Sequence, residues 1–227
     1  SMGQFQWKLI IEYLPRFKDA FITTILLFLA VLVITTIAGI LLAVLNRVVF
    51  NKFKIGRIII NGYSWIFRSL PELIVLLFCY LGLPLLGINI QPIPAAILGF
   101  SITGIAYQYE IFNAGFSAID SGQYLACRAL GIPMHHTLTK IIFPQMLRVI
   151  TPSYITYITG ASKRTSAASA IAVNEIMGMA KKIMQTTVRP FETIFIAMIL
   201  YSIISSVFMI LEILAQKKFG KYVRNAS

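Results

Sequence analysis

The sequence predicts an all-α, polytopic helical membrane protein, and two observations carry this prediction. Of the 227 residues, 58% are hydrophobic and only 12% are charged, whereas a soluble domain carries about twice that charged fraction. Charged residues are also absent from four long stretches, residues 20–46, 73–109, 149–162 and 193–211. A membrane-spanning helix needs about 20 apolar residues. The weaker alternative, an unusually apolar soluble helical protein, does not account for several such stretches.

About five transmembrane helices are expected. Their predicted ranges are 19–45, 58–83, 92–112, 149–174 and 191–214, so the transmembrane domain covers 19–214. An amphipathic N-terminal lead-in covers residues 1–18, and a basic tail covers 215–227. The remaining connections are a basic loop (46–57), an uncharged turn (84–94), a polar loop (113–148) and an outer segment (175–190).

The distribution of basic residues predicts the orientation. If the basic loop, the polar loop and the tail all lie inside, they gather 11 of the 20 Lys and Arg residues (4 + 3 + 4), against 6 in the outer segments and 3 within spans. Cytoplasmic loops carry an excess of these residues. We therefore expect the N-terminus outside and the C-terminus inside. The net charge of +12 follows this membrane pattern and does not indicate a nucleic-acid partner.

The polar loop contains its own helix signals, so we call its central part, residues 122–145, the polar island. Ser121 is placed to cap a helix, Gly131 to end it, and Pro133 to stop it from continuing. A second amphipathic run reaches Phe143, and Pro144 is expected to interrupt it. The pattern predicts two short helices outside the membrane, a surface suited to docking a soluble partner.

The same residues resemble a known family. The motif Ala126-x-Arg128-Ala129-Leu130-Gly131, followed by Phe143-Pro144-Gln145, is similar to the EAA loop of the inner-membrane subunits of ABC importers. Further matches occur in family order over roughly residues 15–215, and together they resemble permeases of the polar amino acid uptake family. They are Arg68-Ser69-Leu70-Pro71, Tyr80-Leu81-Gly82-Leu83-Pro84, Glu110-Ile111-Phe112, Gly115, Gly122-Gln123, Lys163-x-Thr165-Ser166, Ala168-Ser169 and Pro190-Phe191.

The resemblance implies a cytoplasmic coupling helix between the third and fourth spans, which docks into an ATPase subunit. The coupling residues it implies are Gly122, Leu125, Ala126, Arg128, Ala129 and Gly131. Three positions depart from the family pattern: Leu125 replaces the usual Glu, Cys127 replaces an alanine, and Asn113 replaces an arginine. A mere connecting loop is the alternative.

Ionisable residues at membrane depth need a partner or water, since an isolated charge there costs several kcal/mol. The candidates for a translocation path are Arg68, Glu72, Glu110, Lys163, Thr165 and Ser166. Pro71 is expected to break the second span. Arg68 and Glu72 are four residues apart and are expected to share a helix face and pair, either as a packing salt bridge or as part of the path.

Glu72 suggests a substrate class. Resembling permeases often have an apolar residue after this proline, and an acidic one is what members handling basic amino acids tend to show. A buried carboxylate suits a guanidinium or ammonium group, so we hypothesise that Glu72, together with Glu110, contacts a cationic side chain. Glu72→Gln is then expected to weaken arginine or lysine uptake without disturbing assembly.

Residues within the fourth span give a second candidate set. The hydroxyls of Thr165, Ser166 and Ser169 are expected to bond back to the preceding helical turn. The family pattern places an acidic or amide residue after the lysine, and Arg164 departs from it. Lys163 and Arg164 have two alternatives, helix packing with snorkelling or a gating role. Glu175 and Glu192 are expected to be solvated on the outer side; the alternative is that they, with Lys181 and Lys182, meet an external partner.

No enzyme is expected. The chain has no phosphate-binding glycine loop, nucleophile constellation or metal-ligand spacing, and the adjacent His135 and His136 point about 100° apart on a helix. The favoured reading is the permease subunit of an ATP-driven importer of polar, including basic, amino acids in the bacterial inner membrane. It implies a second permease subunit (homo- or heterodimer), two ATPase subunits that bind ATP and magnesium, and an extracytoplasmic solute-binding protein. The alternatives are an ion-coupled secondary transporter or channel subunit and, more remotely, a membrane-embedded enzyme.

Overall fold

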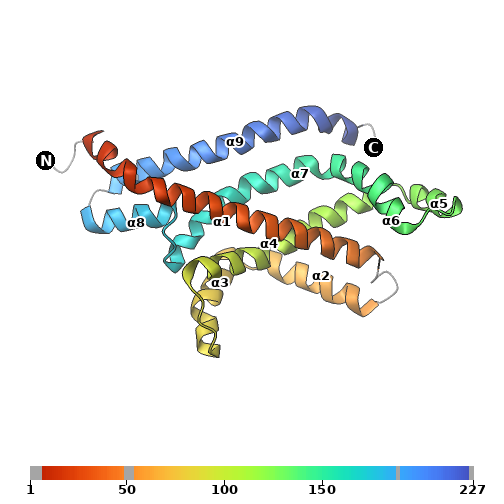
Figure 1. Cartoon of the computed structure of the whole chain (residues 1–227), viewed down its shortest axis with the longest axis horizontal. Helices are drawn as coiled ribbons and strands as arrows, with labels where there is room; N and C mark the ends of the chain where they lie inside the picture. The colour runs from red at the N-terminus through yellow and green to blue at the C-terminus, as the bar shows by residue number, and fades with distance from the viewer. Residues whose placement is uncertain (1–6, 49–53, 188–189, 225–227) are drawn as a thin grey trace.

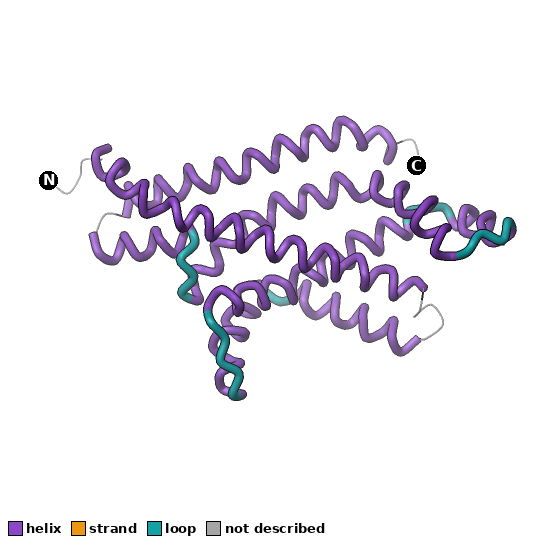
Figure 2. Tube along the Cα trace, in the orientation of Figure 1, coloured by secondary structure: helices purple, strands orange, loops and turns teal. Residues whose placement is uncertain are grey.

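The computed structural model describes residues 7–48, 54–187 and 190–224. Within these ranges the chain is helical almost throughout and contains no strand (Figure 2), so the all-α prediction is confirmed. Some predicted features lie outside the described residues: the first six residues of the lead-in, residues 49–53 of the basic loop, Arg189 and the last three residues of the tail.

Nine α-helices are described. They are α1 (Trp7–Val48), α2 (Lys54–Ser69), α3 (Glu72–Leu77), α4 (Pro92–Ser117), α5 (Ser121–Ala129), α6 (Met134–His136), α7 (Phe143–Arg164), α8 (Ile176–Thr187) and α9 (Pro190–Arg224). Two π-helical turns (Phe78–Gly82 and Thr137–Ile142) and two 3₁₀ segments (Leu83–Leu86 and Thr165–Ile171) complete the described helical structure.

The long helices lie lengthwise beside one another, with α4 among them (Figure 1). Helix α4 packs against α1, α2, α3 and α7, and α9 packs against α7 and α8. Helix α1 begins at one end of the molecule, and α9 ends at the other end, where α5 and α6 also lie (Figure 1). The polar island is therefore gathered at the end of the bundle where α9 finishes.

The predicted second span is not one straight helix. Proline lacks an N–H group and disfavours helical geometry at the preceding residue, and α2 ends just before Pro71. The chain then turns by 102° between Lys54–Ser69 and Glu72–Leu86. The break expected at Pro71 within the predicted span 58–83 is confirmed. In Figure 1 the segment that begins at α3 projects sideways from the bundle of long helices.

The outer helices are long and apolar, whereas the enclosed helix α4 also buries polar side chains. In the described part of the chain, α1 and α9 (as far as Ala215) are long and apolar enough to cross a membrane, and the bent pair that starts at α2 would make a third such element. Helix α4 is covered by four neighbours, so many of its side chains face protein, and small and polar residues such as Thr103 and Gln108 are buried there.

The predicted fourth span is shorter than expected. A helix over 149–174 is wrong at its C-terminal side, since α7 ends at Arg164 and a 3₁₀ segment follows. That segment ends at Ala172, whose φ of 61° is left-handed. A non-glycine residue there interrupts helical propagation. Residues 165–174 contain no charged residue, glycine or proline, so composition alone gave no sign of the interruption.

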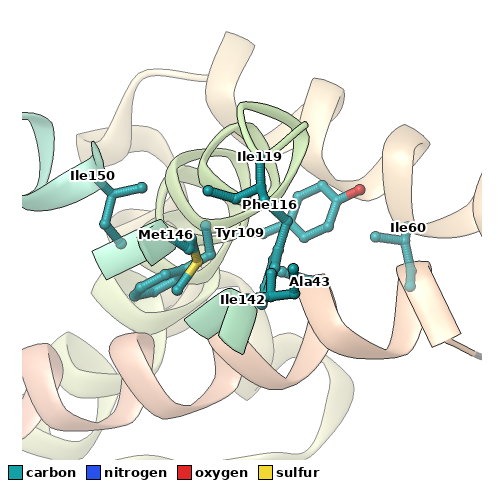
Figure 3. Close-up of a cluster of buried hydrophobic side chains, with 9 residues drawn as sticks. Ala43, Ile60, Tyr109, Phe116, Ile119, Ile142, Met146 and Ile150 are labelled. Atoms are coloured by element: carbon teal, nitrogen blue, oxygen red, sulfur yellow. The ribbon is translucent and has the colours of Figure 1, made fainter. Parts of the chain in front are cut away.

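Three buried clusters hold the bundle together. One lies near the polar island and joins α1, α2, α4 and α7; its members are Ala43, Ile60, Tyr109, Phe112, Phe116, Ile119, Ile142, Met146 and Ile150 (Figure 3). A second joins the start of α1 to α8 and α9, and a third joins the middle of α1 to α3, α4 and the 3₁₀ segment after α7. The polar island thus rests on a packed part of the bundle.

Gly115 permits the close approach of α4 and α7, and its replacement by alanine is expected to destabilise the protein. A Cβ atom at Gly115 would lie 2.2 Å from Ile150 Cγ2 and 2.8 Å from Met146 Cγ. Overpacking of this kind costs about 1–3 kcal/mol, so Gly115→Ala should lower the melting temperature in detergent. Gly62→Ala is the matched control, since no atom lies within 4 Å of a Cβ there. Equal melting temperatures for the two variants would contradict this packing.

Candidate functional site

The first part of the polar island forms a helix with defined ends. Asp120 is its N-cap and accepts a hydrogen bond from the N–H of Gly122 at 2.6 Å, so the prediction that Ser121 is the cap is wrong. An aspartate one residue earlier serves the same purpose. The other end is as predicted: Gly131 has φ 66°, its N–H donates to Arg128 O, and the N–H of Ile132 donates to Cys127 O. These two bonds form a Schellman motif.

The second part of the island does not form a separate helix. Helix α6, the π-helical turn Thr137–Ile142 and α7 follow one another without a break from residue 134 to 164. Pro144 lies in the first turn of α7, where a missing N–H is tolerated after the wider π turn. The predicted interruption at Pro144 is therefore wrong, and the island is joined directly to a long helix of the bundle.

Side-chain contacts fix α5 to the bundle. Gln123 and Gln145 exchange two amide hydrogen bonds, of 3.0 and 2.7 Å. The Tyr124 hydroxyl donates to Phe116 O at 3.4 Å, and the Arg47 guanidinium lies 5.2 Å from the centre of the Tyr124 ring. Burial raises the pKa of Tyr124, although the neighbouring Arg47 acts to lower it. A displacement of α5 would thus be passed to α1, α4 and α7.

All six predicted coupling residues are exposed: Gly122, Leu125, Ala126, Arg128, Ala129 and Gly131. The side chains of Leu125, Leu130 and Met134 are large, apolar and at least half exposed. Cys127, by contrast, is buried against the bundle. The island therefore presents a partly apolar outer face, and Leu125 lies on it where the resembling permeases carry a glutamate.

The predicted path residues fall into three places. The first is an ion pair between α2 and α4, in which Arg68 Nη2 lies 3.3 Å from Glu110 Oε1. The Ser64 hydroxyl also donates to Glu110 Oε1 at 2.7 Å. The expected pairing of Arg68 with Glu72 is wrong, because Pro71 ends the helix between them and turns Glu72 away.

Glu72 instead forms the second ion pair, with Arg164. Glu72 Oε2 lies 3.1 Å from Arg164 Nε, and Glu72 Oε1 accepts a hydrogen bond from the Thr103 hydroxyl at 3.0 Å. The Arg164 guanidinium also lies 5.1 Å from the centre of the Tyr157 ring. Glu72 and Arg164 are both departures from the family pattern, and each supplies the opposite charge for the other. This pairing joins α3 to the C-terminal end of α7.

The cavity beside this pair is small. Glu72, Arg164, Tyr157, Thr35 and Thr165 contribute to its lining, with a volume of about 20 Å³. That volume holds about one water molecule, so an amino acid would enter only if the surrounding helices separated. Thr165 therefore lines the same cavity as the Glu72–Arg164 ion pair.

Lys163 and Ser166 lie in the third place. They line an open groove of about 550 Å³ together with residues of α8 and α9, among them Tyr201, Ser202 and Ser206. The predicted back-bonding is confirmed for two hydroxyls, since Thr165 Oγ1 donates to Ser162 O at 2.8 Å and Ser166 Oγ donates to Lys163 O at 2.9 Å. The structure therefore separates Lys163 and Ser166 from Thr165, although they are neighbours in the sequence.

Sequence reasoning missed the role of Glu175. Glu175 and Glu192 were expected to be solvated, and this is wrong: their exposed fractions are 0% and 3%. The Glu175 carboxylate accepts hydrogen bonds from the N–H groups of Met177 (2.9 Å) and Gly178 (2.7 Å) at the start of α8, and from the Tyr201 hydroxyl. Glu175 directly precedes the first residue of α8, and an acidic residue at a helix start is the sequence signal that was available.

A bundle of long apolar helices, with a capped helix at one end, defines a helical membrane protein. The chain belongs to the family of binding-protein-dependent transport system inner membrane components, whose sequence profile matches residues 35–220. The resemblance and the inner-membrane, multi-pass localisation drawn from the sequence are confirmed. The chain is a transport subunit and not an enzyme, and the ion-coupled alternative is not supported.

Relatives cover nearly the whole chain. The probable amino-acid permease protein YxeN of Bacillus subtilis (strain 168) is 29% identical over 98% of this chain and 100% of its own length. The arginine transport system permease protein ArtQ of the same organism is 30% identical over 78% of this chain and 81% of its own. Among solved structures, an amino acid ABC transporter with histidines superposes with a TM-score of 0.85 at 26% identity, covering 95% of this chain and 100% of that one.

Proposed function

We propose that this chain is the permease subunit of an ATP-driven importer of polar amino acids. The observation that carries the proposal is the TM-score of 0.85 with a solved amino acid ABC transporter over 95% of the chain. Curated relatives that carry amino-acid permease names support the same substrate class. ATP and magnesium belong to a separate ATPase subunit, and this chain binds no cofactor of its own.

Five transmembrane elements fit the bundle: α1, the bent pair of α2 and α3, α4, α7 and α9. Their odd number agrees with the opposite ends at which α1 begins and α9 finishes (Figure 1). Together with the basic residues at the island end, this supports the N-terminus outside and the C-terminus inside. In this arrangement residues 1–18 are the lead-in, 19–214 the permease domain, about 113–148 the cytoplasmic coupling loop and 215–227 the cytoplasmic tail.

The polar island is the proposed contact with the ATPase. Its six exposed coupling residues lie on α5 or directly after it, and the contacts of Gln123 and Tyr124 give α5 firm connections to three helices of the bundle. Two permease subunits, each bound to one ATPase, would enclose the path, and a solute-binding protein would deliver substrate from outside. Closure of the ATPases would press on both islands and reopen the path outward.

The Glu72–Arg164 pair is the proposed substrate-contacting centre of the path. An amino acid carries an ammonium and a carboxylate, and the pair offers a partner for each once the two side chains separate. Any zwitterionic amino acid meets this requirement. A cationic side chain could take the place of the ammonium on Glu72, and it too would have to displace Arg164. Arg68, Glu110, Lys163 and Ser166 remain candidate path residues around this centre.

Uptake of labelled amino acids tests this function. The chain, with its ATPase and solute-binding protein, is expressed in cells that lack their own amino acid importers, and uptake is measured for neutral polar, basic, acidic and apolar amino acids. We expect ATP-dependent uptake of polar amino acids that a proton ionophore does not abolish when ATP is maintained. Uptake driven by an ion gradient without ATPase partners would contradict the proposal.

A further inference from the structure

A polar cavity lies where three helix ends meet near the polar island. Its lining consists of Asn46 and Arg47 from the end of α1, Arg57 from the start of α2, and Asn113 and Ser117 from the end of α4, and its volume is about 250 Å³. Two of the five residues are arginines, and no acidic residue is among them. We call this cavity the arginine pocket.

The two positive charges of the arginine pocket are not neutralised within the described part of the chain. The ion pairs there involve other residues, Arg68 with Glu110 and Arg164 with Glu72. Arg47 is held by uncharged groups: its Nη1 donates to the Ser117 hydroxyl at 3.3 Å, and its guanidinium lies against the Tyr124 ring. Arg57 is exposed. Two guanidinium groups around one polar cavity suit an anion with several oxygen atoms, such as a phosphate.

The rest of the pocket wall is preorganised. Asn46 is only 8% exposed, and its Nδ2 donates to the Tyr109 hydroxyl at 2.6 Å, while that hydroxyl donates to Asn61 Oδ1 at 2.8 Å. Ser117 is tied to Asn113 O at 2.9 Å. These bonds keep the ends of α1, α2 and α4 together, so binding would not require the wall to be rebuilt.

The start of α2 also has an exposed apolar face. Ile55, Ile58 and Ile59 are 74%, 68% and 64% exposed, and helical spacing places them on the side of α2 turned away from Arg57. In a membrane subunit such a face lies against acyl chains, so phospholipids beside α2 have their headgroups at the level of the pocket. Basic pockets between membrane helices on the cytoplasmic side are suited to anionic headgroups. We propose that the arginine pocket binds the phosphate of an anionic phospholipid.

The test uses the assembled transporter in nanodiscs of phosphatidylcholine, with or without an equal part of phosphatidylglycerol. Native mass spectrometry counts retained phosphatidylglycerol, and melting temperature reports stabilisation. Arg57→Gln should weaken retention about fivefold, the effect of one basic residue near an anionic surface. Asn113→Asp should weaken it as well, because a carboxylate in the pocket competes for the arginines. Lys18→Gln, which removes an exposed basic residue of α1 outside the pocket and outside the coupling helix, should retain phosphatidylglycerol as the unaltered protein does.

The melting temperature in pure phosphatidylcholine shows whether each variant folds. If Arg57→Gln does not fold, the comparison uses Asn113→Asp instead. A separate arm adds inorganic phosphate to phosphatidylcholine nanodiscs and should give no stabilisation. Equal phosphatidylglycerol retention by all variants would overturn the proposal. Stabilisation by inorganic phosphate equal to that by phosphatidylglycerol would overturn it too, since the pocket would then serve a soluble anion.

Discussion

Exchanging the two charges of the central ion pair, Glu72→Arg together with Arg164→Glu, is expected to recover stability that either single change removes. Arg164→Glu brings two carboxylates together and leaves Glu72 with the Thr103 hydroxyl as its remaining described partner. Glu72→Arg brings two guanidinium groups together. The side chains of Glu72 and Arg164 are 20% and 38% exposed, so solvent screens part of the loss, and we expect each single change to cost on the order of 2 kcal/mol.

Melting temperature and amino acid uptake of the assembled transporter measure both effects. The single changes should also lower uptake by about tenfold or more, because they alter the proposed substrate contact and a loss of about 1.4 kcal/mol in substrate binding corresponds to a factor of ten. The exchanged pair should recover most of the melting temperature and part of the uptake. Lys18→Gln serves as the control for melting temperature, because it removes an exposed positive charge that belongs neither to the ion pair nor to the coupling helix. An exchanged pair no more stable than the worse single variant would show that the two charges do not act together.

Gly131→Arg is expected to abolish amino acid uptake, and Gly131→Asn to retain much of it. The backbone at Gly131 has φ 66°, a region that costs most L-residues about 1–2 kcal/mol but that asparagine tolerates. No atom of the described chain lies within 4 Å of a Cβ built there, so the chain itself offers no steric obstacle. A residue that does not adopt the left-handed conformation at position 131 would shift the end of α5 and the exposed Leu130 beside it.

Uptake and ATPase co-purification should be measured for both Gly131 variants. If backbone geometry is the requirement, Gly131→Ala should resemble the arginine variant and Gly131→Asn the unaltered protein. If Gly131→Asn loses as much uptake as Gly131→Arg, the absence of a side chain matters for the partner surface, and the account based on φ is wrong.

The sequence predicted the fold class, the helical island and the break at Pro71 because each has a local cause. Uninterrupted apolar runs, a glycine after a helix and a proline within one act on their own neighbourhood. The ends of α7 and the continuity through Pro144 were missed. They depend on a π turn and on a left-handed Ala172, for which the apolar pattern gives no signal.

The candidate site was predicted residue by residue but not in its pairing. Arg68, Glu72 and Glu110 were identified from their charge, and the structure then pairs them across helices, Arg68 with Glu110 and Glu72 with Arg164. Such pairs join residues 42 and 92 positions apart (110 − 68 and 164 − 72), so helical spacing does not reveal them. Two unusual residues of opposite charge, Glu72 and Arg164, were the available hint.

The most direct test of the central claim is ATP hydrolysis by this chain co-purified from membranes with the proteins that bind it. We expect ATPase activity that changes when polar amino acids are supplied and that disappears with Gly131→Arg, since the coupling helix would no longer engage the ATPase. The amino acids that change the rate would identify the substrate. A purified chain without associated ATPase, whose transport follows an ion gradient, would contradict the account.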